Sequence, residues 1–213
     1  MRITVFGAAG NVGSRVVTEA LARGHEVTAV VRDPARFREL PAGARPRVGD
    51  ATDADGVAAA AAGQDLLIGA TRPAPGSEAA LVAAAGALLA GAARTGVRLL
   101  VVGGAGSLTV PGSGGTAVAD DPQYVPTAWR DIALACVAQW ETCRADTDAD
   151  WAYLCPPALL EPGRRTGTYR LGGGELLLDA DGTSAISMED LAVALLDEAE
   201  RPQHRRERFT VAY

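Results

Sequence analysis

The stretch RITVFGAAGNVG (residues 2–13) decides how the rest of the chain is interpreted. Its first five residues are mostly β-branched or apolar, which is typical of a short buried strand. From Asn11 to about Arg23 apolar side chains recur at helical spacing, and Gly24 provides a stop signal. The stretch is therefore predicted to be a strand, a glycine-rich turn and the start of a helix.

Strands and helices alternate along the rest of the chain. This alternation predicts an α/β fold, a Rossmann-type doubly wound parallel sheet with helices on both faces. The 213 residues suffice for one domain, so a single dinucleotide-binding domain over residues 1–213, with a small C-terminal extension, is expected. Further strands are expected at residues 25–31, 46–48, 65–70, 97–102, 150–155 and 208–213, and helices at 53–62, 77–95, 126–145 and 187–200.

Local patterns add three narrower expectations. Ser77 is expected to cap the helix over residues 77–95. The glycine-rich residues 166–178 are expected to form a hairpin. Trp129 and Trp140 lie 11 residues apart, which is close to three helical turns, so they are expected to share one buried face.

The composition excludes several classes of chemistry. All 20 basic residues are arginine, which excludes lysine-based phosphate loops and Schiff-base catalysis. With only His25 and His204, a Ser-His-Asp triad or a histidine-rich metal site lacks material, and no metal is expected. A net charge of -6 argues against nucleic-acid and anionic-membrane partners. Three cysteines without Cys-x-x-Cys spacing, and no leader segment, indicate a cytoplasmic protein with reduced thiols.

The glycine turn predicts a site for the diphosphate of a dinucleotide. Gly7 permits the tight turn, Gly10 lets backbone amides approach a diphosphate, and Gly13 lets the helix pack closely on the strand. In doubly wound sheets, ligands bind at the carboxyl ends of the strands. The candidate cofactor-binding residues at these ends are Gly7, Ala9, Gly10, Asn11, Val12, Gly13, Arg32, Asp50, Ala51, Ala70, Thr71, Arg72 and Gly103.

The end of the second strand bears on which nicotinamide nucleotide binds. An acidic residue there would accept a hydrogen bond from the ribose 2′-hydroxyl, but this strand ends in Arg32 followed by Asp33. A guanidinium matches a 2′-phosphate, so NADPH is favoured, with Arg15 as a second contact. In the alternative, NADH binds through Asp33 and Arg32 faces solvent. Asp50 either accepts a hydrogen bond from the adenine amino group or only caps the next helix.

Several stretches carry a resemblance to a known family. They are the glycine turn, GHEVTAVVRDP (24–34), GDATD (49–53), VVGGAGSL (101–108), PGRRTG (162–167) and ISMEDLAVALLDE (186–198). Together they resemble the atypical short-chain dehydrogenase/reductases, and within them the bacterial NAD(P)H-binding family of NADH-flavin reductases related to flavin/biliverdin-IXβ reductase. The likeness covers nearly the whole chain. It implies a Rossmann fold, bound NADPH or NADH, and a flavin such as FMN or riboflavin as acceptor.

The resemblance also supplies two candidate catalytic residues. The superfamily uses a serine after the fifth strand and a Tyr-x-x-x-Lys motif on the next helix. Ser107 and Tyr124 match the serine and the tyrosine, but Ala128 stands where the lysine would be. Without the ammonium group, the proton relay for reducing an ordinary ketone is incomplete. A flavin tolerates that loss, because its reduction gives a delocalised anion that water can protonate.

The acceptor is expected at the loops of residues 103–125 and 156–178. Arg72, Arg164 and Arg165 are candidates for steering an acidic substituent of the acceptor, such as a flavin phosphate. The expected partner is thus a small-molecule acceptor, and both a monomer and a homodimer stay open. Two other functions stay open as well, a non-catalytic NAD(P)-binding redox sensor and a reductase of one pathway's quinone or polycyclic intermediate. The apolar wall for a planar ring is expected from Pro156, Pro157, Leu159 and Leu160.

Overall fold

An eight-stranded, mostly parallel sheet forms the centre of the structure, which is a computed structural model describing residues 1–213. The strand order β3-β2-β1-β4-β5-β6-β10-β8 is that of a doubly wound Rossmann-type fold, and only β8 runs antiparallel to its neighbour. The predicted fold class is therefore confirmed. The strands are β1 (Arg2–Phe6), β2 (Glu26–Val31), β3 (Arg45–Val48), β4 (Leu66–Gly69), β5 (Arg98–Val102), β6 (Trp151–Cys155), β8 (Arg170–Gly172) and β10 (Glu207–Ala212), with β7 (Leu159–Glu161) and β9 (Ala185–Ser187) in a separate two-stranded sheet.

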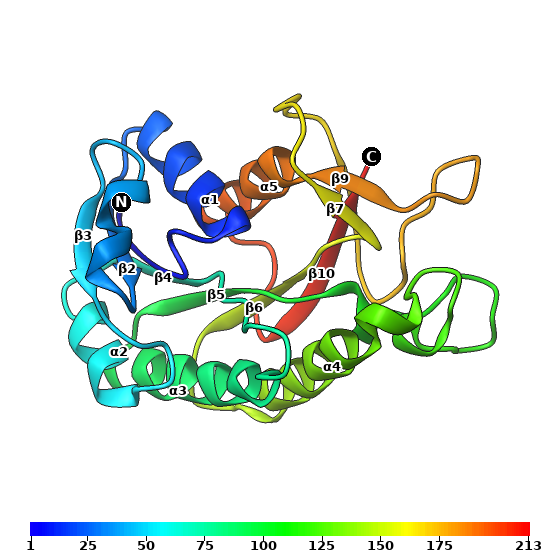
Figure 1. Cartoon of the computed structure of the whole chain (residues 1–213), viewed down its shortest axis with the longest axis horizontal. Coiled ribbons are helices and arrows are strands. Elements are labelled where there is room, and N and C mark those ends of the chain that lie inside the picture. The colour runs from blue at the N-terminus through cyan, green and yellow to red at the C-terminus, as the bar shows by residue number, and fades with distance from the viewer.

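Helices cover both faces of the sheet (Figure 1). One face packs against α1 and α5, and the other against α2, α3 and α4. The central strands are mostly apolar because successive side chains enter opposite cores: Ile3 and Val5 belong to the first, and Phe6 to the second. None of these helices combines the length and apolar character that a membrane crossing requires. Their bounds are α1 (Asn11–Ala22), α2 (Ala54–Ala61), α3 (Ala79–Thr95), α4 (Arg130–Ala145) and α5 (Met188–Glu200).

The register of the parallel strands brings their carboxyl ends to one edge. Phe6 at the end of β1 pairs with Val30 of β2 and with Gly69 of β4. Val102 at the end of β5 pairs with Leu154 of β6. The loops that follow these strands therefore meet along one side of the sheet, where the fold places a ligand.

Two local predictions are wrong. Ser77 does not cap α3, which begins at Ala79 after Glu78, and no side chain makes a capping hydrogen bond there. The glycine-rich residues 166–178 do not form a hairpin, because the strand within them, β8, pairs with the distant β10. This pairing supplies the backbone hydrogen bonds that the outer edge of β10 would otherwise lack.

A buried carboxylate ties the C-terminal extension to α5. The side chain of Asp190 accepts hydrogen bonds from the amides of Thr166 and Gly167 at 2.8 Å each, from the Thr166 hydroxyl at 2.6 Å and from the Tyr213 hydroxyl at 2.7 Å. Burial alone would raise the pKa of Asp190, but these hydrogen bonds outweigh it and hold the pKa below its ordinary value. The two matching stretches PGRRTG and ISMEDLAVALLDE thus contact each other through a structural clamp.

Replacing Asp190 with alanine should lower the free energy of unfolding by about 3 kcal/mol, because four hydrogen bonds to its buried, charged carboxylate are lost together. The folded-state pKa is depressed, so the carboxylate contributes fully above its unfolded pKa of about 4 and less as pH falls through the folded value. Urea unfolding of Asp190→Ala at neutral and acidic pH measures both effects, with the exposed Asp148→Ala as control. Equal losses in the two variants would contradict the clamp.

Candidate functional site

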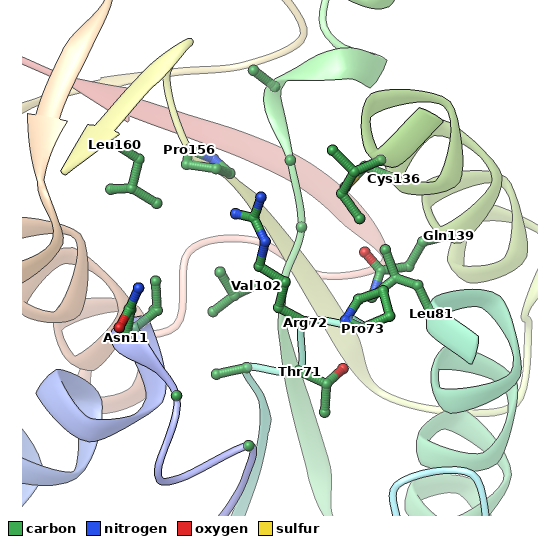
Figure 2. A pocket seen from close by; sticks show the side chains of 18 of the residues that line it. Asn11, Thr71, Arg72, Pro73, Leu81, Val102, Cys136, Gln139, Pro156 and Leu160 are labelled. Carbon is green, nitrogen blue, oxygen red and sulfur yellow. The ribbon is translucent and has the colours of Figure 1, made fainter. Parts of the chain in front are cut away.

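A cavity of about 990 Å³ runs along the carboxyl edge of the sheet. Its volume is at the upper end of the range of about 300–1,000 Å³ that is usual for ligand sites. Figure 2 shows its lining side chains coming from several elements, with Asn11 and Leu160 on one side of the view and Leu81 and Cys136 on the other. The walls come from the loops after β1 to β6, the first half of α4, and residues 181–184 before β9.

The glycine turn has the shape that a diphosphate requires. Gly7 has a φ of +78°, and a Cβ added there would lie 2.4 Å from the Ala70 carbonyl oxygen. A Cβ at Gly13 would lie 2.1 Å from the Gly7 carbonyl oxygen, which explains why Gly13 packs behind the turn and does not line the cavity. These two positions accept only glycine.

The start of α1 leaves amide groups unpaired at the cavity, whereas the Gly10 amide donates a hydrogen bond to the Gly7 carbonyl oxygen at 2.9 Å. Gly10 precedes α1 without any capping side chain, and the first turn of α1 carries no acidic residue. Gly10, Asn11 and Val12 all line the cavity. Uncapped amides at a helix N-terminus bind anions, so these residues fit the diphosphate of a dinucleotide.

The end of β2 presents two arginines to the cavity. Arg32 lines it, and so does Arg36, which donates a hydrogen bond to the Ala9 carbonyl oxygen at 2.7 Å. The Asp33 carboxylate accepts a hydrogen bond from the Ala35 amide at 2.8 Å and caps the short 3-10 helix that begins at Pro34. We did not predict Arg36, although its spacing of four residues from Arg32 in a proline-led segment was a usable signal.

Arg15 is not the second contact that we predicted. Its guanidinium pairs with Glu189 at 2.6 Å and donates to the Asn11 carbonyl oxygen, and it does not line the cavity. Arg15 therefore braces α1 against α5. Arg36 occupies the place at the cavity that we had expected for Arg15.

Asp50 lines the cavity at the end of β3. Hydrogen bonds from the backbone and side chain of Thr52, both 2.9 Å, and the charge of Arg32 hold the pKa of Asp50 below its ordinary value against the effect of burial. The helix cap of α2 is Asp53, so Asp50 does not have that role. A contact between Asp50 and the adenine stays a prediction.

The remaining candidate cofactor residues also face the cavity. Gly103 must be glycine because a Cβ there would overlap the ring of Tyr153, which is fixed by a 2.9 Å hydrogen bond to Gln139. Thus every predicted cofactor-binding residue except Gly13 lines the cavity; the others are Gly7, Ala9, Gly10, Asn11, Val12, Arg32, Asp50, Ala51, Ala70, Thr71, Arg72 and Gly103.

The two candidate catalytic residues lie in different positions. Tyr124 lines the cavity. Ser107 does not, because its hydroxyl lies 3.6 Å from the buried Cys155 sulfur and its carbonyl oxygen accepts a hydrogen bond from Arg208. Two residues of its 3-10 turn, Ala105 and Gly106, do line the cavity. Ser107 therefore supports the wall from behind, and a role in the reaction stays a prediction for both residues.

Of the three arginines considered for an acidic substituent, only Arg72 lines the cavity. Arg165 makes a two-pronged ion pair with Glu19 at 2.7 and 2.9 Å. The carbonyl oxygen of Arg164 accepts a hydrogen bond from the hydroxyl of Ser187. The PGRRTG stretch therefore uses its arginines and backbone to join α1 and α5, and only the Arg72 prediction is left.

The prediction that Trp129 is buried is wrong. Residues 127–129 form a 3-10 turn before α4, so the spacing to Trp140 no longer equals three α-helical turns. Trp140 packs against Trp151 and Tyr153 in the core. Trp129 is 56% exposed, lines the cavity and carries the Arg72 guanidinium carbon 5.3 Å from its ring centroid.

Cys136 is the one cysteine in the cavity lining. Burial raises the pKa of its thiol to about 11, and the Arg72 guanidinium has a smaller effect in the opposite direction. The thiol is therefore protonated at neutral pH and offers a weakly polar wall instead of a nucleophile.

Comparison with known proteins places the chain among nucleotide-binding relatives. A family model described as NAD(P)H-binding matches residues 7–202. "Uncharacterized protein YwnB" of Bacillus subtilis strain 168 is 38% identical over 222 residues, which cover 99% of this chain and 98% of that protein. A "putative exported protein" of Burkholderia pseudomallei is 40% identical with a TM-score of 0.89, and all of both chains is covered. A "putative NADH-flavin reductase" of Streptococcus pneumoniae is 30% identical with a TM-score of 0.88, covering 100% of this chain and 99% of that one.

Proposed function

The chain belongs to the NAD(P)H-binding family of atypical short-chain dehydrogenase/reductases, and we propose that it reduces a flavin or a similar conjugated acceptor with NADPH. The observation that carries the proposal is the single cavity at the carboxyl edge of the sheet. The loops after β1 and β2 contribute the uncapped amides of α1 and Arg32, and the segment between β5 and α4 contributes Tyr124 and Trp129. The same cavity therefore offers an anion site for the nucleotide and an aromatic site for a second ring.

The residues present define how the nucleotide would be held. The amides of Asn11 and Val12 would hold the diphosphate, and Arg32 with Arg36 would hold the 2′-phosphate. Small residues at the ends of β4 and β5 leave space for the nicotinamide and its ribose. When bound, the reduced nicotinamide supplies a hydride.

The acceptor end of the cavity excludes water from a planar ring. Val102, Pro156 and Leu160 form an apolar wall there (Figure 2). The chain contains no lysine, so Tyr124 lacks the partner that would complete a proton relay. The residues therefore bind and orient the acceptor, and the proton comes from water.

The loop after β5 favours a reductase over a redox sensor. Gly103–Gly106 at its start and Gln123–Val125 at its end both line the cavity. A sensor would be free to use this loop only as a surface for a protein partner. Here both ends of the loop line the cavity, which supports the proposal that it holds a second small molecule.

Tyr124→Phe should retain flavin reduction, with kcat within about threefold of the wild type, because the hydroxyl is not the proton source. Loss of a true general acid would lower the reaction rate by about 10²–10⁴-fold. Initial rates of NADPH oxidation with FMN measure the effect. The control is Tyr169→Phe, which removes a hydroxyl bound to Asp197 outside the cavity. A hundredfold loss in Tyr124→Phe alone would make Tyr124 the proton donor and contradict this mechanism.

Turnover of NADPH with excess FMN or riboflavin tests the proposed function as a whole. We expect flavin-dependent consumption of NADPH by the wild type, faster than that of NADH, and none by Gly10→Trp. Nucleotide binding without turnover on any flavin or quinone would favour the sensor instead.

A further inference from the structure

Arg72 extends from the end of β4 into the middle of the cavity. Figure 2 shows its side chain passing Val102 and pointing toward Pro156, which belongs to the apolar wall proposed for the acceptor. In the strand order, β4 is separated from β2 by β1, so Arg72 lies two strands from Arg32, or about 10 Å at the usual strand spacing. The two arginines therefore face different parts of any ligand.

The charge of Arg72 is not neutralised within the protein. No acidic group lies within ion-pair distance of it. Of the lining carboxylates, Asp33 and Asp50 are bound to backbone amides, and Glu161 and Asp181 make no ion pair with Arg72. Arg36, by contrast, pairs with Glu39. A ligand that fills the cavity would remove water from Arg72, and an anionic group is what compensates a guanidinium for that loss.

Trp129 adds an aromatic surface beside this charge. Its indole is exposed in the cavity wall, and its ring faces the Arg72 guanidinium. A large exposed aromatic side chain provides a stacking surface for a planar ring. The unpaired guanidinium next to it provides several N–H donors for an anion. Leu81 and Cys136 lie across the view from Leu160 (Figure 2) and add no charge to the lining.

We propose that Arg72 and Trp129 form a specificity site for conjugated acceptors that carry an anionic arm, phosphate or carboxylate. The inference rests on the proposed reductase function and narrows its substrate class. Trp129 stacks on the planar ring, and Arg72 binds the arm through its guanidinium. Uncharged relatives of the same ring bind more weakly because they leave Arg72 desolvated and unpaired.

Matched acceptor pairs test this site. FMN and riboflavin share one ring and differ by the phosphate, and biliverdin and its dimethyl ester differ by the carboxylate charges. For each compound, binding without nucleotide is followed by fluorescence quenching, and KM is measured with NADPH. The variants are Arg72→Gln, Arg72→Lys and Trp129→Ala. The control is Arg130→Gln, an exposed arginine that pairs with Asp120 outside the cavity.

The wild type should bind the anionic member of at least one pair about tenfold more tightly, as expected for one charge-assisted hydrogen bond. Arg72→Gln should abolish that preference by weakening the anionic member, Arg72→Lys should keep part of it, and Trp129→Ala should weaken both members. Arg130→Gln should keep the wild-type preference. If a preference for the anionic arm depends on Arg72 but no acceptor is reduced, the specificity site holds and the proposed reaction fails.

Three results would overturn the inference. In the first, the wild type binds both members of each pair with equal affinity. In the second, Arg72→Gln weakens the binding of both members equally. In the third, Arg72→Gln raises the Kd for NADPH and leaves the preference for the anionic acceptor unchanged. Arg72 would then contact only the nucleotide.

Discussion

Gly10→Trp should abolish nucleotide binding while the protein stays folded. The backbone at Gly10, with φ of -77° and ψ of 170°, is open to any residue, and a Cβ would have only the Gly7 carbonyl oxygen nearby, at 3.1 Å. The new side chain would then extend into the space where α1 presents its uncapped amides. Gly7 and Gly13 are unsuitable for this test, because a Cβ at either position meets backbone atoms and would disturb the fold.

Calorimetric titration with NADPH measures this effect. The Kd should rise by more than about 100-fold, because several charge-assisted hydrogen bonds to the diphosphate are lost together. Gly86→Ala is the control, since Gly86 lies within α3 with no atom within 4 Å of an added Cβ. Circular dichroism checks that both variants are folded. Wild-type affinity in Gly10→Trp would show that the nucleotide binds elsewhere.

Arg32→Ser should remove the preference for NADPH. We expect its Kd for NADPH to rise by about 10–100-fold, because a guanidinium bound to a phosphate forms paired, charge-assisted hydrogen bonds. NADH has no 2′-phosphate, so its affinity should change little. Arg38→Ser is a matched control from the same segment, because Arg38 is exposed and does not line the cavity.

The alternative through Asp33 makes the opposite prediction. If Asp33 bound the ribose of NADH, the wild type would prefer NADH and Asp33→Ala would lose that preference. The structure already employs the Asp33 carboxylate as a helix cap. An unchanged NADPH affinity in Arg32→Ser would contradict our assignment and favour this alternative.

The sequence predicted the parts of the fold that depend on local pattern. The strands from β1 to β6 and the helices around them were expected near their actual positions, because each is a sustained apolar run or a helical repeat. The strands β7 and β9 were not expected, since three residues are too few for a period to show. The partner of β8 was missed because it lies about 40 residues away in β10.

The residues of the candidate site also fall into those that the sequence predicted and those that it did not. The glycine turn was predictable because its function lies in the backbone, which a local spacing of glycines reveals. The positions of Ser107 and Arg165 were not, because they depend on Cys155 and Glu19, which are distant in the chain. The exposure of Trp129 was missed because residues 127–129 form a 3-10 turn before α4 begins. A sequence pattern indicates which residue types are available, and tertiary contacts decide which of them reach the cavity.

A crystal structure of the protein with NADP and FMN tests the central claim most directly. We predict the diphosphate on the amides of Asn11 and Val12, the 2′-phosphate between Arg32 and Arg36, and the flavin ring beside Trp129. A nucleotide bound outside this cavity, or turned so that its adenosine end lies at Trp129, would contradict the account.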